Sequence, residues 1–271
     1  MLKNTTIKII TIFMLLIGSG LLLINIYGLF QDIRPPHIEN SELRFPNDQP
    51  ISYDLALNLI TLQPQESKAD FAKRATQVVA KGLAHIHWEK YEAEKFNQLI
   101  PIWENYFLYL MGKFSGIPEY KKYHFADYKR SLKRGIGLCG DASMTLSQIL
   151  DLHNITNKIL TYPGHVVVAT NIDGYNLILD PDFGVTIPLS TQEAKEQYQH
   201  AASIYVDAGY TEDDRIFFER LYKSNFKQWD GVSHFITKKY YFEKVSYWLK
   251  WFFPLFCLAL AIYLHTKNPS R

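Results

Sequence analysis

Two long apolar runs, one near each end of the chain, restrict how the polypeptide can fold. The first run, Ile9–Phe30, contains 22 residues and no charge. A helix of that length spans a hydrocarbon core of about 30 Å. A secretory signal peptide is the alternative, because Lys3 and Lys8 precede the run, but its apolar core is usually shorter and ends at a small-residue cleavage site. We therefore expect residues 1–30 to form an N-terminal tip and an uncleaved transmembrane helix.

The second run, Val245–Leu264, is interrupted only by Lys250, which lies near one end and can extend toward the membrane surface. Aromatic residues at both edges of the run are typical of a membrane–water interface. Pro254 is expected close to the beginning of this helix, where proline is tolerated. A buried helix of a soluble protein is the alternative. The apolar character all around the helix favours a C-terminal transmembrane helix with a short tail, residues 245–271.

Two spans place both ends of the chain on one side of a bilayer and the residues between the spans on the other. Lys3 and Lys8 favour a cytoplasmic N-terminal tip, whereas three lysines between residues 238 and 244 favour the opposite orientation. Long segments cross membranes largely regardless of their charge, so we give more weight to the first helix. We expect a two-pass membrane protein, with the lipid bilayer as a partner and the large domain extracytoplasmic.

Between the spans, residues 34–50 are polar and contain several prolines, so we predict a linker or stalk over residues 31–66 and the folded domain over residues 67–244. Apolar residues at helical spacing predict helices over 67–96, 102–114, 139–153, 190–208 and 212–226. Short β-branched runs predict strands over 158–162, 165–170 and 175–180, with a hairpin turn at Asp173–Gly174. Helices, then a strand meander, then helices indicate an α+β fold.

Cys139 lies between glycines at the first turn of a predicted helix, in the segment GIGLCGDASMTLSQIL. The second cysteine, Cys257, is within the C-terminal apolar run, so Cys139 is the one thiol of the aqueous segment. A helix N-terminus lowers a thiol pKa because unpaired N–H groups and the macrodipole stabilise the anion. The N–H groups of Cys139 and Gly140 are also suited to hold an oxyanion. A small buried residue at a helix start is the alternative interpretation.

A nucleophilic cysteine needs a base and a group that orients the base. A two-residue turn at Asp173–Gly174 pairs His165 with Asp182 and puts Asp180 on the same face of the hairpin. Strand pairing alone does not choose between the two carboxylates. Because the proline between them ends the pairing, we expect Asp180 to be better held. Cys139, His165 and Asp180 together form a candidate catalytic triad.

The order of these features resembles the transglutaminase-like superfamily: G-x-G-x-C-G-D, a helix, a strand that opens with histidine, a D-G turn and a strand that ends in D-P, over Tyr128–Gly184. The resemblance implies a papain-like fold, with a central helix packed on an antiparallel sheet. It also implies Cys139 as the nucleophile, His165 as the general base and Asp180 as the orienting acid. In animal transglutaminases an upstream tryptophan supports the oxyanion. Trp103 is the candidate here, with a core position as the alternative.

Two other features are weaker. The run HIHWE, His85 to Glu89, resembles a metal site, but histidines two positions apart diverge on a helix, so we expect no metal there. Lysines and arginines over 121–134 form a basic stretch that can attract an acidic substrate or can be a solvated surface. The formal net charge of +2 gives no basis for binding nucleic acid. We see no signature of a cofactor.

These observations predict a membrane-anchored, cysteine-dependent acyl-transfer enzyme, either a protease or amidase or an enzyme of the transglutaminase type. Its substrate would be an amide in a peptide, a protein or a cell-envelope component. The alternative is a catalytically idle, membrane-tethered binding or scaffold protein that keeps the same fold.

Overall fold

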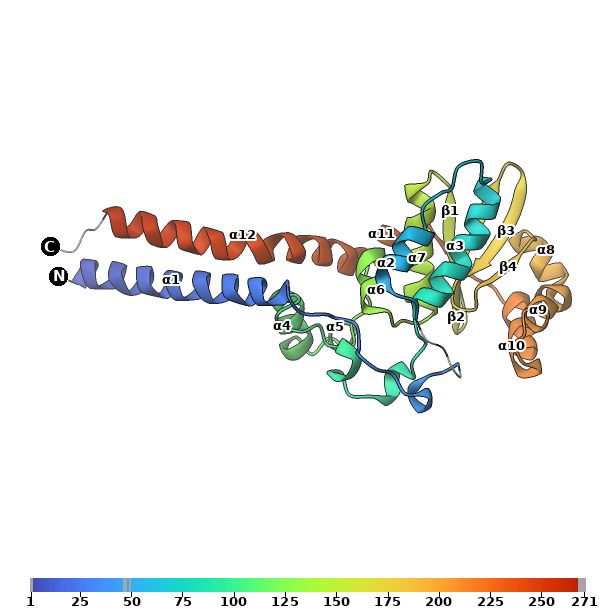
Figure 1. Cartoon of the computed structure of the whole chain (residues 1–271), viewed down its shortest axis with the longest axis horizontal. Coiled ribbons are helices and arrows are strands. Elements are labelled where there is room, and N and C mark those ends of the chain that lie inside the picture. The colour runs from blue at the N-terminus through green and yellow to red at the C-terminus, as the bar shows by residue number, and fades with distance from the viewer. Residues whose placement is uncertain (1, 46–47, 49, 268–271) are drawn as a thin grey trace. The chain divides into compact units, whose positions relative to one another are not determined.

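The computed structural model describes residues 2–45, 48 and 50–267. Contacts divide the chain into two compact units, coloured along the chain in Figure 1. Unit 1 runs to Ile33 and also contains residues 93–123 and the chain from Tyr241 onward. Unit 2 contains residues 34–92 and 124–240.

Two long helices dominate unit 1, α1 (Leu2–Gly28) and most of α12 (Thr237–Lys267). They run side by side (Figure 1), and they approach closely at Gly18, where an added Cβ would lie 2.8 Å from the Leu258 side chain. Glycine permits such close contacts between apolar helices. Both helices are long and apolar enough to cross a membrane, as the two apolar runs predict.

Pro254 lies in the interior of α12 and not close to its beginning, because the helix already starts at Thr237. A proline inside a helix leaves the carbonyl four residues earlier without its usual helical donor, and here that carbonyl belongs to Lys250. The Tyr106 hydroxyl donates to the Lys250 carbonyl at 2.9 Å, and the Asn25 side-chain amide donates to the same oxygen. Two donors from elsewhere in unit 1 therefore satisfy the carbonyl that Pro254 leaves open.

Unit 1 also contains the short elements η3 (Lys95–Asn97), α4 (Tyr106–Phe114) and α5 (Pro118–Lys121). The helix predicted over 102–114 begins later than expected because Asn105 caps it. The Asn105 side chain accepts the N–H groups of Phe107 at 3.1 Å and Leu108 at 3.2 Å.

Unit 2 contains a five-stranded antiparallel sheet in the order β4-β3-β2-β1-β5. The strands are β1 (Asn157–Tyr162), β2 (His165–Ile172), β3 (Tyr175–Asp180), β4 (Val185–Ile187) and β5 (Lys227–Trp229). The first three confirm the predicted strands, and the pairing of Ile172 with Tyr175 across the turn confirms the predicted register. The sequence missed β4 and β5, which are only three residues long.

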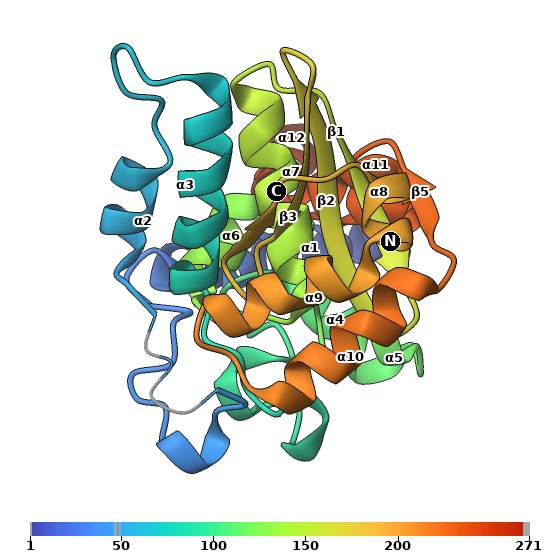
Figure 2. The ribbon, with the colours of Figure 1, turned by 90° about the vertical axis from the view of Figure 1, so that its right-hand side faces the viewer.

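Helices cover both faces of this sheet (Figure 2). In chain order the helical elements of unit 2 are η1 (Asn40–Glu42), α2 (Tyr53–Leu59), α3 (Lys68–Gly82), η2 (Trp88–Lys90), α6 (Tyr128–Arg134), α7 (Cys139–Leu152), α8 (Thr191–Glu196), α9 (Tyr198–Asp207), α10 (Glu212–Lys223) and α11 (Val232–Phe235). Val168 of β2 packs toward α3 and α7, whereas its neighbour Val167 packs toward α8, α9 and α10. Alternate side chains are thus buried on opposite faces, which explains why β2 reads as a continuous apolar run. The α+β class is confirmed.

The helix predicted over 67–96 is wrong after Gly82, where α3 ends. The chain then runs extended, and Ala84 forms a bridge with Ile136 while Ile86 forms one with Leu43. These pairings join segments far apart in the sequence, so they override the local helical pattern. The helix predicted over 190–208 is also divided, into α8 and α9.

Residues 31–66, predicted as a linker or stalk, belong to unit 2 from Arg34 onward. Within them, Ala56 and Ile60 are part of the core that α3 and α7 share with the sheet. Most of this segment is therefore packed against the folded unit. Its second half, residues 51–62, is rich in apolar side chains and contains α2, an element that the sequence interpretation did not include.

Candidate functional site

Cys139 is the first residue of α7, as the sequence predicts. The preceding helix, α6, ends at Arg134 and is capped by Gly135, whose φ of 69° is the left-handed conformation that favours glycine. The Asp141 carboxylate accepts the N–H of Leu138 at 2.9 Å and so caps the first turn of α7. The thiol is partly exposed, and a side chain at Gly140 would meet open space. The fold therefore presents a thiol at a helix N-terminus with room beside it.

The carboxylate that caps α7 is fully buried and belongs to a charged cluster. Burial raises the pKa of Asp141, but His124 at 2.7 Å and Arg134 at 3.9 Å outweigh burial and hold that pKa below its ordinary value. The Arg134 guanidinium also lies over the rings of Trp88 and Phe125. Arg134 ends the predicted basic stretch, so one cation of that stretch is buried and structural.

His165 opens β2 and is buried, and its Nε2 lies 2.7 Å from Asp180 Oδ2. The Tyr205 hydroxyl donates to the same carboxylate oxygen at 2.8 Å. The backbone N–H groups of Asp182 and Phe183 donate to Asp180 Oδ1 at 3.1 and 3.3 Å. A carboxylate with this many donors is held in place, and it orients the imidazole so that Nδ1 is on the side away from Asp180.

The thiol, the imidazole and a second carboxylate meet at one point. Cys139 Sγ, a His165 ring nitrogen and an Asp182 carboxylate oxygen all lie within 4.8 Å of one another. His165 Nδ1 is 4.0 Å from Asp182 Oδ2. The structure thus brings together Cys139, His165 and both carboxylates that the sequence left as alternatives, Asp180 and Asp182.

Burial alone would lower the pKa of His165. The charge and the hydrogen bond of Asp180 outweigh this effect of burial, and Cys139 and Asp182 make smaller contributions in the same direction. Together they raise the pKa of His165 well above its ordinary value. An imidazole that holds its proton this firmly stabilises a thiolate beside it. The imidazole of His165, beside the Cys139 thiol, therefore favours its charged form.

Asp182 has a second buried partner that the sequence did not indicate. His85 Nε2 lies 3.0 Å from Asp182 Oδ1, in an ion pair that is poorly aligned for a hydrogen bond, and His85 Nδ1 lies 2.7 Å from Asp48 Oδ2. Burial lowers the pKa of His85, but the two carboxylates outweigh burial and raise that pKa to about 9. Arg44 adds a contact of 3.4 Å to Asp182 Oδ2. Two cations therefore compensate the Asp182 charge at neutral pH.

His85 belongs to the HIHWE run. The helix predicted over 67–96 included this run, so the contact of His85 with Asp182 was not predicted. His85 lies in the extended segment after α3, and its contact with Asp48 spans 37 residues of chain. A contact between residues so far apart in the chain cannot be predicted from the spacing of neighbouring residues. A cavity of about 700 Å³ adjoins it, lined by His85, Asp182, Phe183 and Tyr210 among others.

Trp103 belongs to unit 1, where its backbone packs against Gly28, whereas the candidate site is in unit 2. In unit 2, Trp88 stacks on His124 with ring centroids 4.6 Å apart, beside the capped start of α7. The basic stretch is likewise divided, because residues 121–123 belong to unit 1 and residues 124–134 to unit 2.

Cys139, His165 and Asp182 are also residue types that bind Zn²⁺, and three protein ligands are typical of a catalytic zinc site. In this structure the same groups already have protein partners. Asp180 holds His165, and His85 and Arg44 contact Asp182. The contact of Asp180 with His165 matches the orienting group that the base of a cysteine nucleophile requires.

No protein-family model, no curated protein and no solved structure matches this chain. The resemblance to the transglutaminase-like superfamily therefore rests on the order of its motifs. The structure adds an α+β fold with an antiparallel sheet and a Cys–His–Asp group in space. This geometry is compatible with a catalytic triad.

Proposed function

We propose that the chain is a membrane-anchored, cysteine-dependent acyl-transfer enzyme with a transglutaminase-like, papain-type core. One observation carries the proposal: His165 is held by Asp180 at 2.7 Å and has the thiol of Cys139 beside it at the N-terminus of α7. The packing of α7 against the central strand β2 supports the papain-type arrangement.

In the proposed reaction, His165 takes the proton of the Cys139 thiol, and the thiolate attacks the carbonyl carbon of an amide. The N–H groups of Cys139 and Gly140, which have no acceptor within the first turn of the helix, stabilise the oxyanion. His165 then gives its proton to the leaving amine, and a thioester remains on Cys139. Asp180 keeps the Nε2–H of His165 engaged, so that Nδ1 serves the thiol. Water or a second amine then accepts the acyl group.

The two candidate spans lead us to propose that this domain is anchored in a membrane and lies outside the cytoplasm. An amide in a peptide, a protein or a cell-envelope component is the matching substrate class, and we favour hydrolysis over transfer to an amine.

The proposal is tested by the rate at which iodoacetamide alkylates Cys139, in a Cys257→Ser background that leaves one thiol. A thiol with the ordinary pKa of about 8.5 is only a few per cent ionised at pH 7. We expect His165→Ala and Asp180→Asn each to slow alkylation at pH 7 by about tenfold or more, because the imidazolium that stabilises the thiolate is lost or misoriented.

His153→Gln serves as the matched control, because His153 lies at the opposite end of α7 and contacts the Ile60 carbonyl. It should leave the alkylation rate unchanged. Equal rates in the wild type and in His165→Ala would refute an activated thiolate and favour the idle scaffold.

A further inference from the structure

Helix α4 is apolar almost all the way around. Its sequence is YFLYLMGKF, and Lys113 is its single charged residue. A helix with this composition requires an apolar environment on more than one side.

One side of α4 is covered within unit 1. Leu108 is fully buried. At Gly112 the neighbours are so close that an added Cβ would lie 2.4 Å from both the Leu99 side chain and the Tyr120 carbonyl oxygen. This side of α4 therefore packs tightly against Leu99 and Tyr120 of unit 1.

The other side of α4 exposes a stripe of large apolar side chains. Leu110 is 46% exposed, Phe114 is 75% exposed, and Ile117, just after the helix, is 42% exposed. Leu110 and Phe114 are four residues apart and therefore lie on one face of α4. Ile117 follows Gly116, whose φ of 72° lies outside the helical range. We call these three residues the α4 stripe.

The stripe continues the apolar surface of α12. Phe107, one turn before Leu110, packs edge-on against Phe253 of α12 with ring centroids 6.1 Å apart. The Asn105 side chain, which caps α4, donates to Ser246 Oγ of α12 at 3.2 Å. Helix α4 therefore starts beside the second candidate span.

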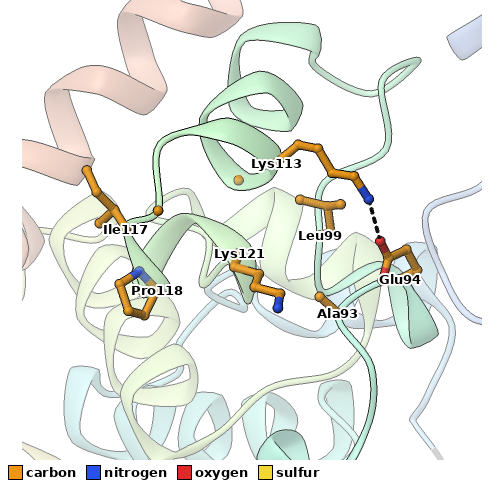
Figure 3. A pocket seen from close by; sticks show the side chains of 9 residues that line it. Ala93, Glu94, Leu99, Lys113, Ile117, Pro118 and Lys121 are labelled. Atoms are coloured by element: carbon orange, nitrogen blue, oxygen red, sulfur yellow. Dashed lines mark hydrogen bonds and ion pairs between the residues drawn. The ribbon is translucent and has the colours of Figure 1, made fainter.

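Polar groups of unit 1 lie along another edge of α4. Lys113 donates to Glu94 at 3.2 Å, and with Lys121 they line a cavity of about 450 Å³ (Figure 3). The helix thus exposes apolar side chains together with one lysine whose charge is paired, and Ile117 of the α4 stripe lines the same cavity. A helix at a membrane surface likewise places its apolar side chains in lipid and its charged groups toward water.

We propose that α4 lies in the boundary between the lipid headgroups and the acyl chains, with the α4 stripe immersed in the bilayer. This proposal rests on the proposed anchoring by α1 and α12, and it adds a third helix to the membrane contact. The occupant is the bilayer, and not another protein, because the stripe is continuous through Phe107 and Phe253 with a helix suited to span the membrane.

The test uses the full chain in vesicles of phosphatidylcholine and phosphatidylglycerol, with Cys139→Ser and Cys257→Ser as the background. A nitroxide spin label is attached at Phe114→Cys or, in a second variant, at Leu110→Cys. The readout is the ratio of relaxation by oxygen, which concentrates in lipid, to relaxation by a water-soluble nickel chelate. We expect a ratio several-fold higher at both stripe positions than at Lys113→Cys on the same helix.

A label at Phe256→Cys, an exposed position within the second candidate span, separates the two proposals. If position 256 is in lipid and position 114 is open to nickel, the α4 proposal is wrong while the anchoring stands. If position 114 is shielded from both reagents, a protein covers the stripe and the proposal is overturned. If position 256 is itself open to nickel, the anchoring fails and the α4 proposal fails with it.

Discussion

At the residue scale, Asp182 places a negative charge near the Cys139 thiol, and neighbouring cations compensate this charge. Its carboxylate lies 4.0 Å from His165 and within 4.8 Å of the Cys139 thiol. A negative charge at that distance disfavours a thiolate. His85 and Arg44 contact the same carboxylate, and they compensate its charge. These two cations therefore reduce the net negative charge that faces the Cys139 thiol.

This arrangement predicts a pH effect. The pKa of His85 is raised to about 9, so the residue is charged below that pH and neutral above it. In His85→Gln the Asp182 charge loses one cation at neutral pH, and both the ionisation of Cys139 and the deprotonation of His165 should then require a higher pH. We expect the pH window of rapid alkylation to move upward by about one unit.

The matched control for this measurement is again His153→Gln, which should keep the wild-type window. A window that stays in place in His85→Gln, with the protein still folded by circular dichroism, would show that His85 has only a structural role.

At the scale of elements, the interior proline of α12 requires partners from other helices. Tyr106 of α4 and Asn25 of α1 donate to the Lys250 carbonyl, which Pro254 leaves without a helical donor. Three helices of unit 1 therefore meet at one backbone oxygen. This junction links α4 to the pair of candidate spans.

A double-mutant cycle tests the junction. Tyr106→Phe should lower the free energy of unfolding by about 1 kcal/mol, because it removes one hydrogen bond to the buried carbonyl. In a Pro254→Ala background residue 254 regains its N–H, so the same change should cost less. The measurement is thermal unfolding in detergent.

Tyr247→Phe is the control for the cycle, because Tyr247 donates to the Glu104 side chain and not to the Lys250 carbonyl. Tyr247→Phe should lower the free energy of unfolding by the same amount with and without Pro254. If Tyr106→Phe also costs the same in both backgrounds, the hydroxyl does not substitute for the missing N–H.

At the scale of the whole molecule, two spans require both ends of the chain to be on the same side of the bilayer. In right-side-out vesicles with Cys257→Ser, a membrane-impermeant maleimide should label Cys139, whereas a reporter fused to the C-terminus should be inside. Labelling of Cys139 only after the vesicles are permeabilised would reverse the proposed orientation.

Local patterns in the sequence were sufficient for several elements. The two apolar runs predict α1 and the apolar part of α12, and the Asp173–Gly174 turn predicts the pairing that puts His165 and Asp180 on one face. The glycines before Cys139 predict the start of α7. These features depend on side-chain periodicity and turn chemistry, which act over a few neighbouring residues.

Other features depended on contacts between distant parts of the chain. The end of α3 at Gly82, the pairing of His85 with Asp48 and Asp182, and the donors to the Lys250 carbonyl all join segments that no local pattern connects. A buried charge or an open backbone carbonyl must find a partner wherever the folded chain provides one. Only the tertiary structure could therefore show that Asp182 is shared between two histidines, and that α4 is joined to a helix suited to span the membrane.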